Sequence, residues 1–237
     1  MAIAFTALLV VVLIASVISF VVMGLLQHRR TYALGRTAHE KSMRFSPEDP
    51  FDVSRRYANF ALIGGGHSPR AANVTYGRVG QVGVRVFDFC YELGHGTRRI
   101  TRRCNVVVVE ADFDIPPVLL WSDRDAALGP LAARRRSGHV RCWSYSGRSE
   151  VAAAVADACS SLAGRAVSVE TKGGTLMISG PASRGRDGYI VRPEQVPPII
   201  DLLRGFLPAG GNEAAPSEDA HSGAELLNLN VENSHGS

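Results

Sequence analysis

The sequence has little lysine, few cysteines and none of three motifs that mark common nucleotide-binding and hydrolytic sites. Lys41 and Lys172 are its only lysines, and its four cysteines form no C-x-x-C pair. It contains no G-x-x-x-x-G-K-[ST] phosphate loop, no G-x-G-x-x-G that opens a helix and no G-x-S-x-G nucleophile elbow. No motif therefore points to a P-loop nucleotide-binding protein, a dinucleotide-dependent enzyme or a hydrolase with a nucleophile elbow.

The remaining candidates for chemistry are separate residues rather than a set. Cys90, Cys104 and His95 lie on or between two predicted strands, without the paired spacing of a metal site. A membrane-anchored hydrolase or thiol enzyme that uses these three residues is the alternative to a non-catalytic protein. The sequence favours the non-catalytic protein, with no catalytic residue, cofactor, metal ligand or small-molecule substrate.

The first residues form one long apolar run. From Ala2 to Leu26 every residue is apolar or small, with Thr6, Ser16 and Ser19 as the only hydroxyls. This run exceeds the roughly 20 apolar residues that a helix needs to cross a bilayer. A secretory signal peptide carries lysine or arginine before its apolar region, and here neither residue precedes the run. We therefore predict an uncleaved transmembrane helix over residues 1–27.

Basic residues follow this run and predict the topology of the chain. Lysine and arginine close to a membrane end mark its cytoplasmic side. We predict a single-pass protein of the bacterial inner membrane, with its N-terminus outside, a basic connector over residues 28–56 and a cytoplasmic soluble domain. The basic residues of the connector nearest the run are Arg29, Arg30, Arg36, Lys41 and Arg44.

The soluble domain is predicted over residues 57–207. Alternating apolar segments predict strands first, and apolar residues at helical spacing predict two late helices, over residues 150–162 and from residue 193 or 194 to 206. Strands first and helices late indicate an α+β fold with an antiparallel sheet. Residues 208–237 carry only acidic charge and little apolar sequence, which predicts a disordered acidic tail.

The clearest hairpin joins residues 81–92 to residues 98–111. A turn centred on His95 sets Asp88 opposite Arg102 and Cys90 opposite Ile100. We predict Asp88 and Arg102 as an ion pair, because an acid among valines is costly to bury alone. The same register separates Cys90 from Cys104, so a disulfide between them is not expected. Reduced thiols agree with a cytoplasmic domain.

Two clusters of arginine are the strongest charge features of the domain. We predict that they contact anionic lipid or an acidic protein partner, since basic residues close to a bilayer attract anionic headgroups. No recognisable module or interleaved aromatic pattern suggests nucleic-acid binding. The predicted contact residues are Arg98, Arg99, Arg102, Arg103, Arg134, Arg135 and Arg136.

The hairpin sequence also resembles a family of uncharacterised bacterial membrane-anchored proteins. The residues concerned run from Tyr76-Gly77-Arg78-Val79-Gly80 to Val86-Phe87-Asp88-Phe89-Cys90-Tyr91, a glycine-basic turn followed by a V-F-D-[FY]-x-Y strand. The resemblance extends over residues 71–208 and implies a shared sheet domain behind a membrane helix. It assigns no catalytic residues to this chain. Within the strand, Phe87, Phe89 and Tyr91 are predicted to form one aromatic face that packs against another layer. Together these features predict a membrane-tethered, non-catalytic interaction module.

Overall fold

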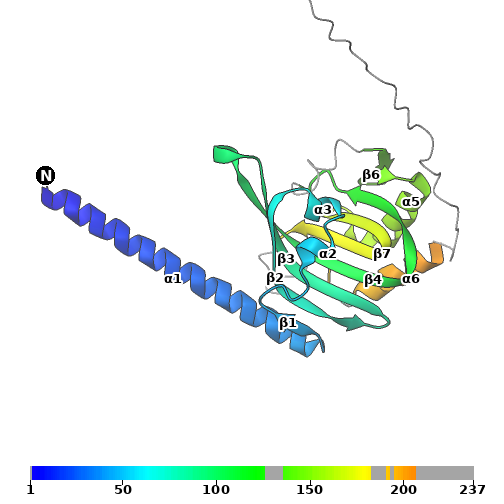
Figure 1. Cartoon of the computed structure of the whole chain (residues 1–237), viewed down its shortest axis with the longest axis horizontal. Coiled ribbons are helices and arrows are strands. Elements are labelled where there is room, and N and C mark those ends of the chain that lie inside the picture. Colours follow the sequence, from blue (N-terminus) through cyan, green and yellow to red (C-terminus); the bar gives the residue numbers. More distant parts are fainter. Residues whose placement is uncertain (1, 126–135, 183–190, 193–194, 207–237) are drawn as a thin grey trace, which may run out of the picture.

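The computed structural model describes residues 2–125, 136–182, 191–192 and 195–206. In these residues a long N-terminal helix leads into a seven-stranded antiparallel sheet with two late helices (Figure 1), which confirms the predicted α+β class. The elements are α1 (Ala2–Glu40), β1 (Arg44–Ser46), α2 (Val53–Arg56), α3 (Ala61–Gly64), β2 (His67–Val79), β3 (Val82–Leu93), η1 (Gly96–Arg98), β4 (Ile100–Trp121), β5 (Gly138–Val140), β6 (Trp143–Gly147), α5 (Ser149–Ala158), η3 (Ser160–Leu162), β7 (Ser168–Pro181) and α6 (Val196–Phe206).

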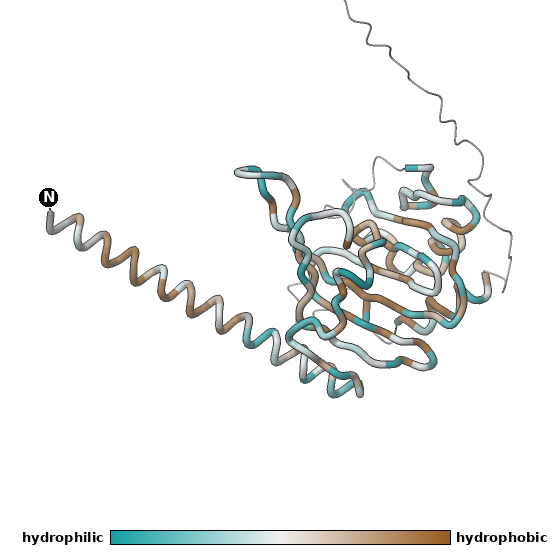
Figure 2. Tube along the Cα trace, viewed as in Figure 1, coloured by the Kyte–Doolittle hydropathy of each residue, from teal (hydrophilic) through white to brown (hydrophobic). Residues whose placement is uncertain are grey.

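Helix α1 is one continuous element of 39 residues. Among the described residues it is the one helix long and apolar enough to cross a membrane, by length and composition. Its apolar part projects away from the sheet (Figure 2), and the side chains of residues 9–26 are exposed. Residues 2–26 extend about 37 Å at about 1.5 Å per residue.

The second part of α1 belongs to the folded domain. Leu34, Ala38 and Met43 are buried, at 6%, 0% and 6% exposure. No proline interrupts residues 2–40, so the backbone continues as a helix past the end of the apolar run. Residues 28–56, predicted as a basic connector, hold the end of α1, strand β1 and helix α2. The sheet therefore begins at Arg44 rather than after residue 57.

Strand β4 organises the sheet. The strand order is β1-β2-β3-β4-β6-β5, and β7 pairs with β4 along its other edge. The first half of β4 pairs with β3 and the last four residues pair with β6, while β7 follows both halves. The sheet is therefore built from two groups of strands that share β4 and β7.

Pro116 and Pro117 lie inside β4, where shifts in register interrupt its pairing with β7. A proline has no N–H to donate to the ladder. The Thr171 hydroxyl takes over locally, because it donates to the Pro116 carbonyl at 2.6 Å and accepts from the Val118 N–H at 3.1 Å. The prolines therefore disturb the strand without ending it.

The predicted register of the β3–β4 hairpin was wrong by three residues. Asp88 pairs with Asn105, and Arg102 pairs with Tyr91, so Asp88 and Arg102 lie on opposite faces of the sheet. The cause is the connection between the strands, which contains the 3-10 turn η1 in addition to the expected glycines. Because side chains alternate along a strand, an odd shift moves every predicted partner to the other face.

The same register separates two of the cysteines. Cys90 pairs with Arg103, and its neighbour Phe89 pairs with Cys104, so the two thiols point to opposite faces. All four cysteines of the chain are free.

The face of the sheet that carries Val82, Val84 and Val86 is covered by α5 and α6. Buried residues of both helices pack there together with Ala38 and Met43 from the N-terminal region. Helix α1 therefore joins the same core as the two late helices.

The opposite face carries the aromatic side chains of β3. Phe87, Phe89 and Tyr91 are all at most 1% exposed and share this face, which confirms the predicted aromatic row. Phe89 stacks on Tyr91 with ring centroids 5.8 Å apart. Buried residues of α2, α3 and the segment between them cover the row.

The later part of the chain holds the two predicted late helices, as α5 and α6, and one long strand, β7. Its bulge at Gly173 has φ +56°, a conformation that glycine adopts without strain. The predicted acidic tail over residues 208–237 falls entirely outside the described residues.

Candidate functional site

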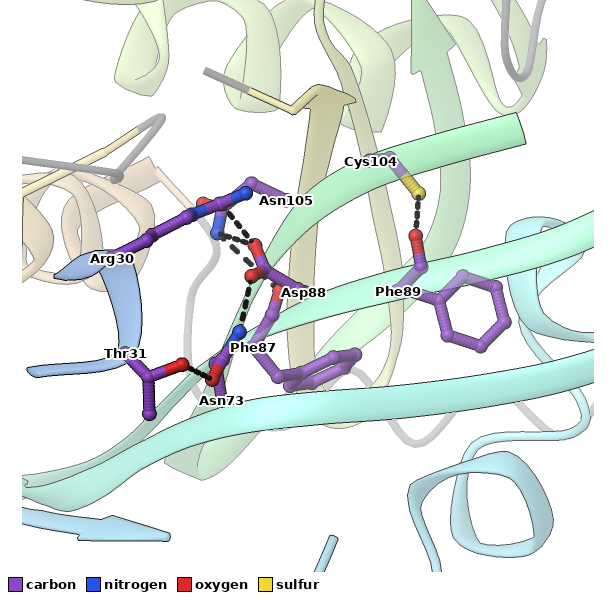
Figure 3. A network of polar contacts seen from close by, with 8 residues as sticks. All are labelled: Arg30, Thr31, Asn73, Phe87, Asp88, Phe89, Cys104 and Asn105. Carbon is purple, nitrogen blue, oxygen red and sulfur yellow. Dashed lines mark hydrogen bonds and ion pairs between the residues drawn. The ribbon is translucent and has the colours of Figure 1, made fainter. Parts of the chain in front are cut away.

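The junction between α1 and the sheet is held by a polar network around Asp88. Arg30 of α1 donates to Asp88 Oδ1 at 2.7 Å, and the Asn73 amide donates to Asp88 Oδ2 at 2.9 Å. The Thr31 hydroxyl in turn donates to the Asn73 side-chain oxygen at 3.2 Å, and Asn105 lies on the other side of the carboxylate (Figure 3). The carboxylate predicted to pair with Arg102 is thus paired with Arg30, from a segment 58 residues away.

A row of side chains crosses three strands next to this network. Arg70 of β2 pairs with Cys90 of β3, and Cys90 pairs with Arg103 of β4. The row lies on the same face as Asp88, because Cys90 and Asp88 are two residues apart on one strand. A cavity of about 300 Å³ is lined by Arg30, Arg70, Asp88, Cys90 and Arg103, among others.

A second hollow lies along α1 and shares lining residues with the cavity. It has a volume of about 530 Å³ and is lined by Phe20, Met23, Gly24 and Leu26 together with Arg30 and Arg103. The two hollows therefore share two arginines. One is basic and lies at the sheet, and the other is mainly apolar and lies along the part of α1 that could enter a membrane.

The predicted arginine contacts do not form one surface. Arg98 and Arg99 are exposed at the hairpin tip, where Arg99 pairs with Glu92 at 3.2 Å. Arg102 is half-buried beside Tyr91, and Arg103 alone of this cluster reaches the cavity.

The second predicted cluster is only partly described. Arg134 and Arg135 lie outside the described residues. Arg136 donates to the Ser144 hydroxyl at 2.8 Å, at the β5–β6 end of the sheet. Arg30 and Arg70, which do line the cavity, were not predicted as contact residues.

Three residues at the β5–β6 end have the side-chain types of a catalytic triad but not its order. Ser144 donates to Asp123 at 3.0 Å and lies 3.3 Å from His139 Nδ1. A triad requires the histidine between the serine and the acid, where the acid orients the imidazole. Here the serine is the central residue and is 1% exposed, so this group has the geometry of a structural contact.

The residues of the thiol-enzyme alternative do not converge. Cys104 is buried in the aromatic core, and burial raises the pKa of its thiol far above the ordinary range. Cys90 faces the cavity on the other side of the sheet. His95 lies at the hairpin tip, with its ring 4.9 Å from that of His67. Among the described residues, no three histidine, cysteine or acidic side chains gather as metal ligands.

A separate charged cluster joins the end of α2 to the face of the sheet that carries the aromatic row. Glu110 accepts hydrogen bonds from Arg56 at 2.9 Å and from the Tyr57 hydroxyl at 3.0 Å, and it pairs with Arg85 at 2.5 Å. Burial alone would raise the pKa of Glu110, but the bonds and charges of Arg85, with those of Tyr57 and Arg56, lower it overall.

We expect the substitution Glu110→Gln to lower the free energy of unfolding by about 1–2 kcal/mol at pH 7, since bonds to a charged acceptor are lost. A carboxyl whose folded pKa is lowered stabilises the protein fully above its unfolded value, 4.5 here, and less as the pH falls through the folded value. The difference from wild type should therefore shrink at pH 3. Urea unfolding at both pH values measures it, and an equal difference at both would contradict this role of Glu110.

Comparison with known proteins gives a match at the level of the fold. Neither family models nor curated proteins match the chain, in keeping with the resemblance of its hairpin to uncharacterised bacterial proteins. The structure is similar to the crystal structure of the mycobacterial trehalose monomycolate transport factor A, TtfA, with a TM-score of 0.52. The match covers 76% of this chain and 97% of that chain at 14% sequence identity. The chain thus shares its fold with a mycobacterial transport factor.

Proposed function

We propose that this chain is a non-catalytic, membrane-tethered module that serves a transport process at the bacterial inner membrane. The observation that carries the proposal is the continuity of α1, whose apolar part is long enough to cross a bilayer and whose last turns are buried in the domain. A domain attached in this way is held at the membrane surface in a fixed orientation, instead of moving on a flexible linker.

The similarity to a transport factor supports the transport part of the proposal. TtfA is described as a trehalose monomycolate transport factor. Ser144, His139 and Asp123 lie together with the serine in the centre, which is not the order of a catalytic triad. We therefore assign the domain the task of binding a partner or a lipid next to the bilayer.

The positive charges that follow the apolar run favour a cytoplasmic domain and an external N-terminus. The test is to fuse alkaline phosphatase or a fluorescent protein, each separately, after Pro208 in a bacterial host. Fluorescence without phosphatase activity is the expected result. Phosphatase activity would put the domain outside the cytoplasm and contradict the proposed topology.

A further inference from the structure

The basic cavity and the second, mainly apolar hollow, called the groove below, lie where a membrane-bound protein would hold a lipid. Met23, Leu26, Arg30, Leu34 and Ala38 follow one another at spacings of three or four residues, so they share one face of α1. Along this face the surroundings change from the groove, to the cavity, to the buried core.

The charges in the cavity favour an anion. Arg30, Arg70 and Arg103 line it, and of these Arg30 is neutralised by Asp88 at 2.7 Å. The structure gives the side chains of Arg70 and Arg103 no hydrogen bond or ion pair with another described residue. Two exposed arginines, Arg70 and Arg103, thus line a cavity of about 300 Å³, a size suited to a small ligand. Guanidinium groups bind phosphate oxygens with two parallel hydrogen bonds.

The groove favours an acyl chain beside that anion. Phe20, Met23 and Leu26 give it apolar walls, and a side chain added at Gly24 would meet no atom within 4 Å. Because Arg30 and Arg103 line both hollows, a phosphate in the cavity would lie beside a chain in the hollow along α1. The apolar run ends at Leu26 and Arg30 lies one turn further, so the cavity is at the level of the headgroups when residues 2–26 cross a bilayer.

We propose that the junction of α1 and the sheet binds one anionic glycerophospholipid, with its phosphate between Arg70 and Arg103 and an acyl chain against Gly24. This inference rests on the membrane attachment in the proposed function and names the ligand of the site. It does not depend on which side of the membrane the domain faces, so its failure would leave the topology result intact.

The test uses the full-length chain purified in detergent and native mass spectrometry to measure binding of the first lipid. Phosphatidylglycerol should bind at least tenfold tighter than phosphatidylcholine. The double variant Arg70→Gln/Arg103→Gln should lose at least tenfold in phosphatidylglycerol affinity. The control Arg55→Gln/Arg98→Gln removes the same charge from exposed positions outside both hollows and should stay within twofold.

A second pair of variants tests the groove. Gly24→Trp fills it and should weaken phosphatidylglycerol binding at least fivefold. Val22→Trp adds the same side chain about 200° around the helix and should leave binding unchanged. Glycerophosphoglycerol, the headgroup without acyl chains, should not compete at concentrations where the lipid saturates the protein.

Three results would overturn the proposal. Equal affinity for phosphatidylglycerol and phosphatidylcholine would show that the site does not select an anionic headgroup. Equal losses of affinity in both arginine double variants would show that binding depends only on general charge attraction. Competition by glycerophosphoglycerol or inorganic phosphate at the concentration of the lipid would show a site for a soluble phosphate. If the double arginine variant does not fold, the Gly24→Trp and Val22→Trp variants still test the proposal, and equal phosphatidylglycerol affinity of these two variants would contradict it.

Discussion

Replacing Ala38 with aspartate is expected to lower the free energy of unfolding by at least about 3 kcal/mol, because it places an unpaired charge in a closed core. Ala38 is 0% exposed and packs in the cluster that contains Val82, Val84 and the late helices. The loss should appear in urea unfolding followed by the fluorescence of Trp121 and Trp143, both of which are buried.

The neighbouring substitution His39→Asp is the control. His39 is exposed on the same turn of α1, so an aspartate there remains in water. It should change the free energy of unfolding by less than about 0.5 kcal/mol. Equal effects of Ala38→Asp and His39→Asp would mean that the end of α1 is not packed against the domain.

The second large effect is expected at Asp88. Replacing it with alanine removes the acceptor for Arg30 and Asn73 and should cost about 1.5–3 kcal/mol, the range for bonds to a charged group. Arg30 and Asp88 keep 34% and 20% side-chain exposure, so the cost stays below that of a fully buried pair. Glu48→Ala removes one negative charge from an exposed position and should have little effect.

A double-mutant cycle assigns this loss to the junction of α1. Once Asp88 is alanine, Arg30→Ala should cost less than it does in wild type, because its partner is already gone. The difference measures the coupling between the helix and the sheet. Additive effects of the two substitutions would contradict the ion pair, and the predicted partner Arg102 should show no coupling with Asp88.

The sequence predicts the fold class and the aromatic row because both depend on local patterns. Alternating residues place Phe87, Phe89 and Tyr91 on one face whatever the pairing of the strand. The register was not predictable in the same way, since β4 carries four consecutive valines at residues 106–109. Such a run presents apolar side chains to both faces of the sheet, so the apolar pattern fits two registers that differ by three residues equally well. The conformation of the turn then determines the register.

The candidate site was missed for a different reason. Arg30, Arg70 and Arg103 come from α1, β2 and β4, and only the tertiary structure brings them to one cavity. Arginines adjacent in sequence, such as Arg98 and Arg99, gave a stronger local signal and yet lie at an exposed tip. One signal was available, because the spacing of Met23, Leu26, Arg30, Leu34 and Ala38 continues one face of the apolar helix into the domain.

The central claim is that α1 holds the domain at the bilayer in one orientation. Double electron–electron resonance tests it directly, with spin labels at Val22→Cys and Arg98→Cys in the protein reconstituted into liposomes. In this variant Cys90 and the exposed Cys142 are replaced by serine, so that they are not labelled. A single narrow distance distribution is the expected result, and Ala38→Asp should broaden it. A broad distribution in the protein with Ala38 intact would mean that the domain moves freely on its helix, and would contradict the account.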